Sequence, residues 1–463
     1  MESITGLLNS ITAFFTAPSV HSAYDIMNAF NTLVWGPPMV IILLGLGIYF
    51  TFRLNFLQKY TWRAMKLSVK KVDSEGMVSS FGSLAVMIGA TVGTGSIIGV
   101  TTAISEGGPG ALFWMVVAGF FNFAIKYCEC LVSFKYRVKL PHGEYVGGPM
   151  YVLKNGLNMK KTALVFAAAT ALMGFGDALI QTNSLAAIYG SVFSVPAYLT
   201  TAVLVVLTGS VILGGVRKIA ALCKWLVPGM AVLYIVLCLT VLILHWEKFP
   251  WAVVCIFKSA FSGAALVGGA IGITLKEAVR YGVSRGVLSN EAGSGSGAIA
   301  AAAAQTPNPV RQGLVSATTV FWDTLVICLL SGVTVVVAGD WQSGTLFGAQ
   351  LAQSAFSTLP GGSYFLLMSL TLFAFSTLVG WSYYTAKSAQ FCLGVNVEKP
   401  IYVLWLLMMC LGGFLSPKLV WELADTAIAV MCVPNILSLW LLRGVVFGET
   451  KTYLAQELAF ARK

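Results

Sequence analysis

Long apolar runs recur along almost the whole of this chain, and they restrict its fold more than any other feature. A helix needs about 17 to 25 mostly apolar residues to cross a bilayer. With 57% hydrophobic and 10% charged residues, the composition fits an all-α polytopic membrane protein rather than a soluble domain. We predict about eleven transmembrane helices, at residues 34–53, 81–105, 111–134, 163–189, 199–215, 225–246, 261–280, 316–338, 363–386, 401–416 and 419–442.

Glycine clusters interrupt two of these segments near their middle. The clusters are Gly89-Ala-Thr-Val-Gly93-Thr-Gly95-Ser-Ile-Ile-Gly99 and, five segments later, Gly268-Gly269-Ala-Ile-Gly272. An unwound backbone inside a membrane is tolerated only where it lines a cavity, and a pair of interrupted segments in two halves points to a transporter's binding site. The sequence therefore predicts that the protein moves a small solute.

The spacing of the clusters also predicts a repeated architecture. Segments two to six and seven to eleven form two five-helix units, and an odd number of helices inserts the second unit in the opposite direction. We expect an inverted repeat with one extra helix before it. The predicted parts are an extracytoplasmic segment with a short interfacial helix at 1–33, the extra helix and a cytoplasmic loop at 34–80, the first repeat at 81–260, the second repeat at 261–442 and a cytoplasmic tail at 443–463.

Basic residues alternate from loop to loop, although the net charge of +11 alone would suggest a nucleic-acid partner. If the amino terminus is outside, the inside loops and tail hold 25 of the 29 Lys and Arg residues, and the outside loops hold 3. Cytoplasmic loops are enriched in Lys and Arg. We therefore expect no nucleic-acid partner, an amino terminus outside the cell inner membrane and a cytoplasmic carboxyl terminus.

Signals of catalysis are weak in this sequence. The nine cysteines lie mostly in apolar runs, which predicts buried thiols, and the three histidines have no metal-ligand spacing. There is no G-x-x-x-x-G-K-[ST] phosphate loop for ATP-driven pumping. We expect neither a transition-metal site nor an enzyme, and we interpret the Gly-Ser run at 293–297 as a structured cytoplasmic turn.

Several sequence blocks are specific enough to compare with known families. They include Trp35-Gly-Pro-Pro, Val92-Gly-Thr-Gly-Ser-Ile-Ile-Gly-Val, Ser289-Asn-Glu-Ala-Gly-Ser-Gly-Ser and Leu372-Phe-Ala-Phe-Ser-Thr-Leu-Val-Gly-Trp. Together they resemble the alanine/glycine:cation symporters, also called sodium:alanine symporters, over nearly the whole chain. The resemblance implies a LeuT-type five-plus-five fold and sodium-coupled symport of alanine or glycine by alternating access.

Two positions depart from the pattern of that family. It usually has Asn where this chain has Ser96, and often Asn where it has Asp177. The first departure puts a second sodium site in doubt, because a short hydroxyl replaces an amide carbonyl. The second places a carboxylate inside a membrane segment, where charge is costly and usually functional.

A zwitterionic amino acid needs partners for both of its charges in a low-dielectric site. Amide groups at the amino end of a half-helix suit the carboxylate, and freed carbonyls suit the ammonium or a cation. Gln181 lies four residues after Asp177, and Trp381 four after Thr377, so each pair shares a helix face. The resemblance places a matching glutamine at the substrate. We expect the substrate site at Gly93, Thr94, Gly95, Ser96, Gln181, Gly268, Gly272, Thr377 and Trp381.

Sodium is a hard cation that needs several oxygen ligands. The LeuT-type resemblance places a sodium site between the first broken helix and segment nine. The expected ligands are Gly89, Val92, Phe373, Ser376 and Thr377. We expect Na⁺ as the co-transported ion, no other cofactor, a small neutral amino acid as substrate, and function as a monomer in the lipid bilayer.

Two other interpretations stay open. The first is a proton-coupled amino acid symporter in which Asp177 carries the proton. The second, from a different class, is a solute-gated channel or receptor, although a channel predicts a charge ring or a continuous polar pore that these segments do not show. We interpret the remaining acidic residues Glu277, Asp323 and Asp425 as structural pairs or gates nearer the membrane faces.

Overall fold

The computed structural model describes residues 18–70, 72–262, 274–414 and 417–460. Its α-helices of eight or more residues are α2 (Pro18–Val34), α3 (Pro37–Arg53), α4 (Thr61–Val69), α5 (Ser80–Thr91), α6 (Val100–Gly107), α7 (Gly110–Lys135), α9 (Lys160–Phe193), α10 (Ala197–Ile212), α11 (Gly215–Leu244), α12 (Phe249–Ser262), α13 (Leu275–Asn290), α15 (Pro309–Val320), α16 (Leu329–Ala338), α17 (Gly348–Ser357), α18 (Gly362–Leu393), α19 (Glu398–Gly412), α20 (Pro417–Leu441) and α21 (Arg443–Phe460).

Shorter elements connect or extend these helices. They are α8 (Pro149–Tyr151), α14 (Gly297–Ala302), the π-helical turns η2 (Gly95–Gly99), η3 (Val152–Gly156) and η6 (Phe321–Cys328), the 3-10 turns η1 (Leu57–Tyr60), η4 (Trp246–Lys248), η7 (Asp340–Ser343) and η8 (Val395–Val397), and the strands β1 (Val78–Ser79), β2 (Val138–Lys139), β3 (Tyr145–Val146) and β4 (Ala304–Gln305).

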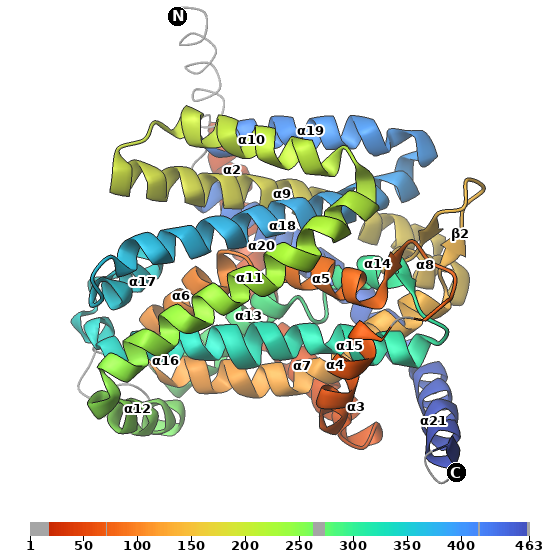
Figure 1. Ribbon diagram of the computed structural model, residues 1–463, viewed down its shortest axis with the longest axis horizontal. Helices are drawn as coiled ribbons and strands as arrows, with labels where there is room; N and C mark the ends of the chain where they lie inside the picture. Colours follow the sequence, from red (N-terminus) through yellow and green to blue (C-terminus); the bar gives the residue numbers. More distant parts are fainter. Residues whose placement is uncertain (1–17, 71, 263–273, 415–416, 461–463) are drawn as a thin grey trace, which may run out of the picture.

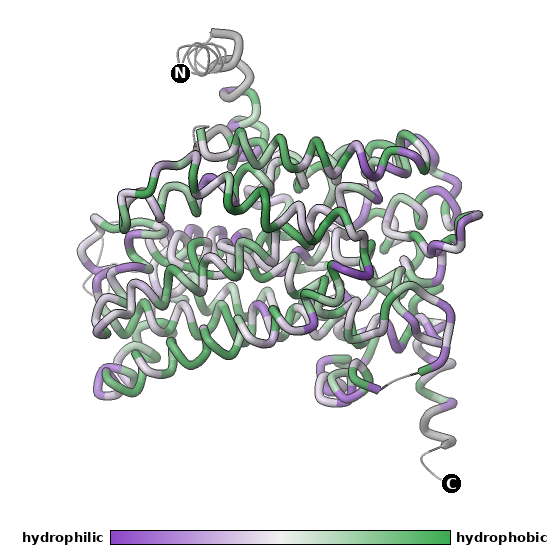
Figure 2. Tube along the Cα trace, turned by 45° about the horizontal axis from the view of Figure 1, so that its top comes forward, coloured by the Kyte–Doolittle hydropathy of each residue, from purple (hydrophilic) through white to green (hydrophobic). Residues whose placement is uncertain are grey.

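The long helices form a bundle with two distinct ends. Helices α7, α9, α11, α15 and α18 run lengthwise through the molecule, with α12 and α17 at one end and α4, α8 and β2 at the other (Figure 1). Hydrophobic residues follow the long helices, and hydrophilic residues gather toward the two ends (Figure 2). This distribution is the one expected of a bundle that spans a bilayer.

Within the described ranges, eight helical segments are long and apolar enough to cross a membrane, and the bent pair α5 and α6 adds a ninth. The predicted all-α polytopic class is confirmed. This count does not establish the predicted number of about eleven. Helix α10, which coincides with one of the predicted segments, is apolar but shorter than the helices that were counted. The predicted segment 261–280 also coincides with the end of α12, the start of α13 and residues 263–273, which lie outside the described residues.

Capping residues fix where the helices near the centre begin. The Ser79 hydroxyl accepts a hydrogen bond from the amide of Gly82 at 3.1 Å at the start of α5. Thr274 and Glu277 form a capping box at the start of α13, and the Asn308 side chain caps α15. Such caps satisfy amide groups that have no partner within the helix. The starting residues of these three helices are therefore well defined.

The first predicted interruption is confirmed. Helix α5 ends at Thr91, and its axis makes an angle of 56° with the helical segment that continues from Gly95 to Gly107. The interruption leaves carbonyl groups of the last turn of α5 without the amide partners that a continuous helix would supply. These carbonyls are available to side chains or ions.

A second interruption of the described chain was not predicted from the sequence. Gly268 and Gly272 fall outside the described residues, whereas a break at 291–296 separates α13 from α14. The sequence also led us to interpret the Gly-Ser run at 293–297 as a cytoplasmic turn. That interpretation is wrong, because Ser294 and Ser296, like the preceding Glu291, are buried inside the bundle. Close packing holds the half-helix before it, since a Cβ at Gly282 would lie 2.3 Å from the Ala111 carbonyl oxygen of α7.

Two short strand pairs complete the end of the bundle that carries α4 and α8. Strands β2 and β3 pair antiparallel, and β1 and β4 pair parallel with Val78 opposite Ala304 and Ser79 opposite Gln305. Because β1 directly precedes α5 and β4 closely follows α14, the parallel pair joins one half of each interrupted helix.

Candidate functional site

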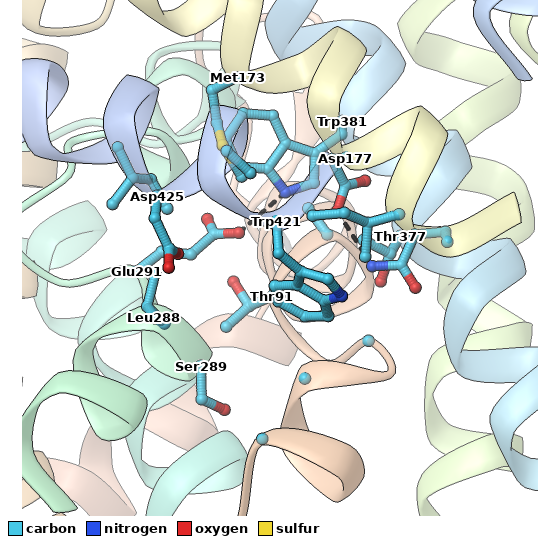
Figure 3. Close-up of a pocket in the computed structure, with 18 of the residues that line it drawn as sticks. Thr91, Met173, Asp177, Leu288, Ser289, Glu291, Thr377, Trp381, Trp421 and Asp425 are labelled. Atoms are coloured by element: carbon cyan, nitrogen blue, oxygen red, sulfur yellow. Dashed lines mark hydrogen bonds between the residues drawn. The ribbon is translucent and has the colours of Figure 1, made fainter. Parts of the chain in front are cut away.

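A cavity of about 70 Å³ lies between the two helix interruptions and helices α9, α18 and α20 (Figure 3). The first break contributes Gly93 and Gly95, and α9 contributes Asp177 and Gln181. Helix α18 contributes Thr377 and Trp381, the second break contributes Glu291, and α20 contributes Trp421 and Asp425. A water molecule needs about 10–15 Å³ of such a cavity, so the volume suits roughly five to seven non-hydrogen atoms.

Glu291 is the most constrained residue of this cavity. It ends α13 in the left-handed conformation, with φ of +54°, which is uncommon for a residue other than glycine. Its carboxylate accepts hydrogen bonds from the Trp381 indole at 2.9 Å and from the Ser296 hydroxyl, and its carbonyl accepts one from Lys126 at 2.9 Å. Contacts from α7, from α18 and from the residue that precedes α14 therefore hold Glu291 at the cavity.

A second acidic side chain approaches the cavity from α9. The Gln181 amide donates to the Asp177 carboxylate at 3.0 Å, and the Gln181 carbonyl accepts from the Thr94 hydroxyl at 2.9 Å. The other Asp177 oxygen is buried and has no hydrogen-bond partner in the structure. This chain of contacts links the first break to α9, and it leaves one carboxylate oxygen free for a ligand.

Charge in the cavity is unequally distributed. Three carboxylates, Asp177, Glu291 and Asp425, line it together with one guanidinium, Arg285. Apolar walls come from Met173, Trp381 and Trp421, and both indole rings lie beside the acidic groups (Figure 3). The arrangement can accept a small ligand that carries an ammonium group and presents little apolar surface.

Five oxygen atoms converge next to the cavity, where α18 crosses the end of α5. The Ser376 hydroxyl lies 3.0 Å from the Gly89 carbonyl oxygen and 2.8 Å from that of Phe373. The Thr377 hydroxyl lies 3.1 Å from the Gly89 carbonyl oxygen and 3.4 Å from that of Val92. Neutral oxygens at such spacing can surround a small hard cation. These are the five residues predicted from the sequence as cation ligands.

A third polar cluster surrounds Asp323 in η6. Its carboxylate accepts from the Ser96 hydroxyl at 2.6 Å and from the Ser289 hydroxyl at 2.9 and 3.0 Å. The prediction that Asp323 lies near a membrane face is wrong, because the residue is fully buried at the middle of the apolar segment Pro309–Ala338. Asp323 thus ties the first interruption to the last turn of α13.

The structure brings most of the predicted substrate residues together and separates a few. Gly93, Gly95, Gln181, Thr377 and Trp381 all line the cavity, as does the predicted carboxylate Asp177. Thr94 is held behind Gln181, and Ser96 bonds to Asp323. Sequence reasoning missed Glu291, Arg285 and Trp421 as lining residues. The signal for Glu291 was present in the block Ser289-Asn-Glu-Ala-Gly, where glycines and serines interrupt a buried helix.

A buried cavity of mixed polarity between two interrupted helices, inside a bundle that spans a membrane, defines a secondary transporter. Comparisons with known proteins agree with this class. The sodium:alanine symporter family model matches residues 20–462. The sodium/alanine symporter AgcS of Methanococcus maripaludis is 42% identical over 443 residues, which cover 93% of this chain and 97% of that protein.

Further relatives show how wide the similarity is. The probable sodium/glutamine symporter GlnT of Bacillus subtilis is 34% identical over 440 residues, which cover 93% of this chain and 90% of that protein. The crystal structure of MhsT in complex with L-phenylalanine has a TM-score of 0.60 and 15% identity, over 80% of this chain and 89% of that one.

The chain belongs to the sodium:alanine symporter family. It is a multi-pass integral membrane protein and a transporter rather than an enzyme, and it has the LeuT-type fold.

Proposed function

We propose that this protein accumulates a small neutral amino acid, alanine or glycine, by symport with Na⁺ through alternating access. One observation carries the proposal. Thr377 lines the cavity, while its hydroxyl lies within 3.4 Å of both the Gly89 and the Val92 carbonyl oxygens of the adjoining oxygen cluster. A residue shared by the two sites gives each ligand a direct effect on the other, which is the requirement for coupled transport.

The substrate would lie between groups of opposite character. The carboxylate faces the amino end of η2 at Gly95, where helix amides and the helix dipole favour negative charge. The ammonium faces Glu291 and Asp177, which offer carboxylate oxygens from the other side. With Trp381 and Trp421 as walls, a volume of about 70 Å³ favours alanine and glycine, which have about five or six non-hydrogen atoms.

Sodium would be held by the five oxygens of Gly89, Val92, Phe373, Ser376 and Thr377. All five ligands are neutral, so a bound Na⁺ keeps its charge and responds to the membrane potential. One charge that moves through ~100 mV supplies about 2.3 kcal/mol, which corresponds to roughly fifty-fold accumulation.

The proposed setting is the cell inner membrane, with the amino terminus outside, the carboxyl terminus cytoplasmic and a monomer as the functional unit. Residues 81–260 and 261–442 would be the inverted repeats. The excess of Lys and Arg at one set of loops supports this orientation. Side-specific labelling of a single cysteine at exposed His142, between β2 and β3, tests it, because this position should react only from the cytoplasmic side.

Uptake into proteoliposomes tests the function. Two relatives carry names that refer to alanine and glutamine, and the MhsT structure holds L-phenylalanine, so the panel should contain glycine, alanine, glutamine and phenylalanine. We expect an inward sodium gradient to accumulate glycine and alanine far above glutamine and phenylalanine. Equal accumulation of glutamine would overturn the proposed size limit, and failure of all neutral amino acids would overturn the proposed substrate class.

A second candidate is proton-coupled symport through Asp177, and the buried Asp177 oxygen without a partner is the observation that favours it. Asp177→Asn distinguishes the two mechanisms. Under sodium coupling, the variant should keep sodium-driven accumulation, because an amide can still accept and donate hydrogen bonds at this position. Under proton coupling, it should lose accumulation and keep exchange of labelled for unlabelled substrate. Accumulation by the parent protein with a proton gradient in sodium-free buffer would exclude our choice of cation.

A further inference from the structure

A second and larger cavity lies on the outside of α5, on the face away from the central site. Its volume is about 360 Å³, and its walls are almost entirely apolar, with Phe81 and Ile88 from α5 and Pro228 and Ala231 from α11 among them. It reaches the outer surface of the bundle, since the lining residues Val69 and Val232 are 66% and 61% exposed. Apolar cavities of about 150 Å³ already bind small hydrocarbons, so this one can hold a hydrocarbon chain.

A polar cavity of about 530 Å³ adjoins it, lined by residues at the end of α4, at the start of α5 and at Gln305 of β4. The two cavities share Ser68, Val69 and Phe81 as lining residues. Among the described residues that line the polar part, Lys70 and Lys224 are basic and Asp73 is acidic. The combined groove is therefore apolar along its length and basic at its mouth.

The Lys224 side chain and the backbone at Lys70 are both fixed by neighbouring residues. A Cβ at Gly82 would lie 2.9 Å from the Lys224 Cε atom, so the stem of this side chain runs along α5. Arg311 donates to the carbonyl oxygens of Leu67 and Lys70 at 3.0 and 3.1 Å, which fixes the end of α4. Within the described part of the chain, neither Lys70 nor Lys224 forms an ion pair.

Helix α4 has the exposed aromatic and basic residues that are typical of helices at the level of the lipid headgroups. Trp62 is 70% exposed, and the Lys66 ammonium lies 5.6 Å from the centre of its ring. Short helices with exposed aromatic and basic residues lie in the interfacial region of a membrane. We therefore expect the mouth of the groove to lie in the interfacial region of the bilayer, where the phosphate group of a lipid adjoins its acyl chains.

We propose that this groove binds one anionic phospholipid, with its phosphate between Lys70 and Lys224 and one acyl chain along α5 and α11. The charge at the mouth selects against a zwitterionic lipid, whose cationic group would approach the same lysines. The bound chain packs against Ile88 and Val92, and Val92 also supplies a carbonyl oxygen to the central oxygen cluster. The lipid would thus support the half-helix that carries the cation ligands.

Native mass spectrometry of the full-length protein, with equal amounts of phosphatidylglycerol and phosphatidylcholine, tests this assignment without any transported substrate. The result is therefore independent of the proposed function. We expect the parent protein to retain one phosphatidylglycerol in preference to phosphatidylcholine. Lys70→Ala and Lys224→Ala should each lower this preference about fivefold, since one basic residue near the headgroup contributes about 1 kcal/mol.

Two further variants separate headgroup from chain. Lys160→Ala combined with Lys161→Ala removes two positive charges, one more than either single variant, from exposed positions at the start of α9 and should leave the preference unchanged. Ala231→Trp fills the apolar part and should prevent retention of the lipid in protein that still elutes as a single folded species.

Three outcomes would overturn the proposal. The first is equal retention of the two lipids by the parent protein. The second is an equal loss of preference in the Lys160 and Lys161 variant, which would indicate nonspecific attraction. The third is displacement of the lipid by excess glycerol 1-phosphate, which would identify a site for free phosphate compounds instead.

Discussion

At the scale of single residues, two glycines of the first break have opposite surroundings. A Cβ at Gly93 would lie 2.7 Å from the Thr377 hydroxyl oxygen and 3.2 Å from the Gln181 amide nitrogen. A Cβ at Gly95 would meet no atom within 4 Å, although Gly95 lines the central cavity. Gly93 therefore permits close contact between helices, and Gly95 leaves room for the ligand.

Gly95→Ala should change the substrate profile and leave the fold intact. The added methyl group occupies cavity volume, and one methylene in a pocket changes discrimination by roughly tenfold or more. We expect the concentration for half-maximal uptake to rise at least tenfold more for alanine than for glycine. Gly93→Ala is the matched comparison, and it should impair both substrates because it displaces Thr377. An equal loss for both substrates in Gly95→Ala would contradict the proposal that cavity volume limits the size of the substrate.

Ser376→Ala should weaken the response to sodium. The variant removes one of the five converging oxygens, and an interaction with a charged group contributes about 1.5–3 kcal/mol, or a factor of ten or more. We expect the sodium concentration for half-maximal uptake to rise about tenfold, with little change in substrate affinity at saturating sodium. Ser382→Ala on the same helix is the control, because within the described residues that hydroxyl donates to the Val379 carbonyl oxygen of its own helical turn and not to the oxygen cluster. An effect of equal size in both variants would remove Ser376 from the cation site.

At the scale of elements, the second break is shaped by its neighbours. The Glu129 carboxylate of α7 accepts from the Gly293 amide at 2.6 Å and from the Asn435 side chain of α20 at 2.7 Å. Asn435 also donates to the Gly293 carbonyl oxygen at 2.9 Å, and Lys126 holds the Glu291 carbonyl oxygen. These contacts take the place of the hydrogen bonds that a continuous helix would make.

Glu129→Ala should therefore destabilise the protein strongly. Lys126 and Glu129 are both fully buried, and the loss of one partner leaves a buried charge and an amide without compensation, which costs about 3–5 kcal/mol. We expect a large fall in the thermal unfolding midpoint of the purified protein. Lys135→Ala breaks a partly exposed pair with Glu449 and should cost about 1 kcal/mol or less. Similar midpoints for the two variants would contradict this account of the second break.

At the scale of the whole molecule, the sequence predicts those features of the fold that a lipid environment requires. Apolar runs and the glycines at 89–99 indicate the bundle and its first break, because lipid excludes unpaired backbone groups. The break between α13 and α14 was not predicted, for a physical reason. Helix α13 contains Lys276, Arg280 and Arg285, so its hydropathy is too low to mark it as half of an interrupted membrane helix. The contacts of Trp381 and Lys126 with Glu291, and of Ser96 with Asp323, join distant segments, and no local pattern reveals them.

The paired strands β1 and β4 form a direct connection between the two interrupted helices. The amides of Met77 and Val78 donate to the Ala303 carbonyl oxygen at 2.8 and 3.2 Å, and the Ser80 and Ser83 hydroxyls bond to carbonyls of the same segment. A cysteine pair at Ser79 and Gln305, in a background without native thiols, tests whether the joined halves move as one body. Oxidation should leave uptake intact, and a block that a reductant reverses would show that the halves separate.

If β1 and β4 stay paired throughout the transport cycle, α5 and α14 move as one rigid body. One such movement displaces the Gly89 and Val92 carbonyls at the end of α5 and also shifts the turn at Glu291 that precedes α14. The amino acid and the cation would then lose their ligands in the same movement. The stoichiometry of transport would depend on this mechanical connection as well as on the two affinities.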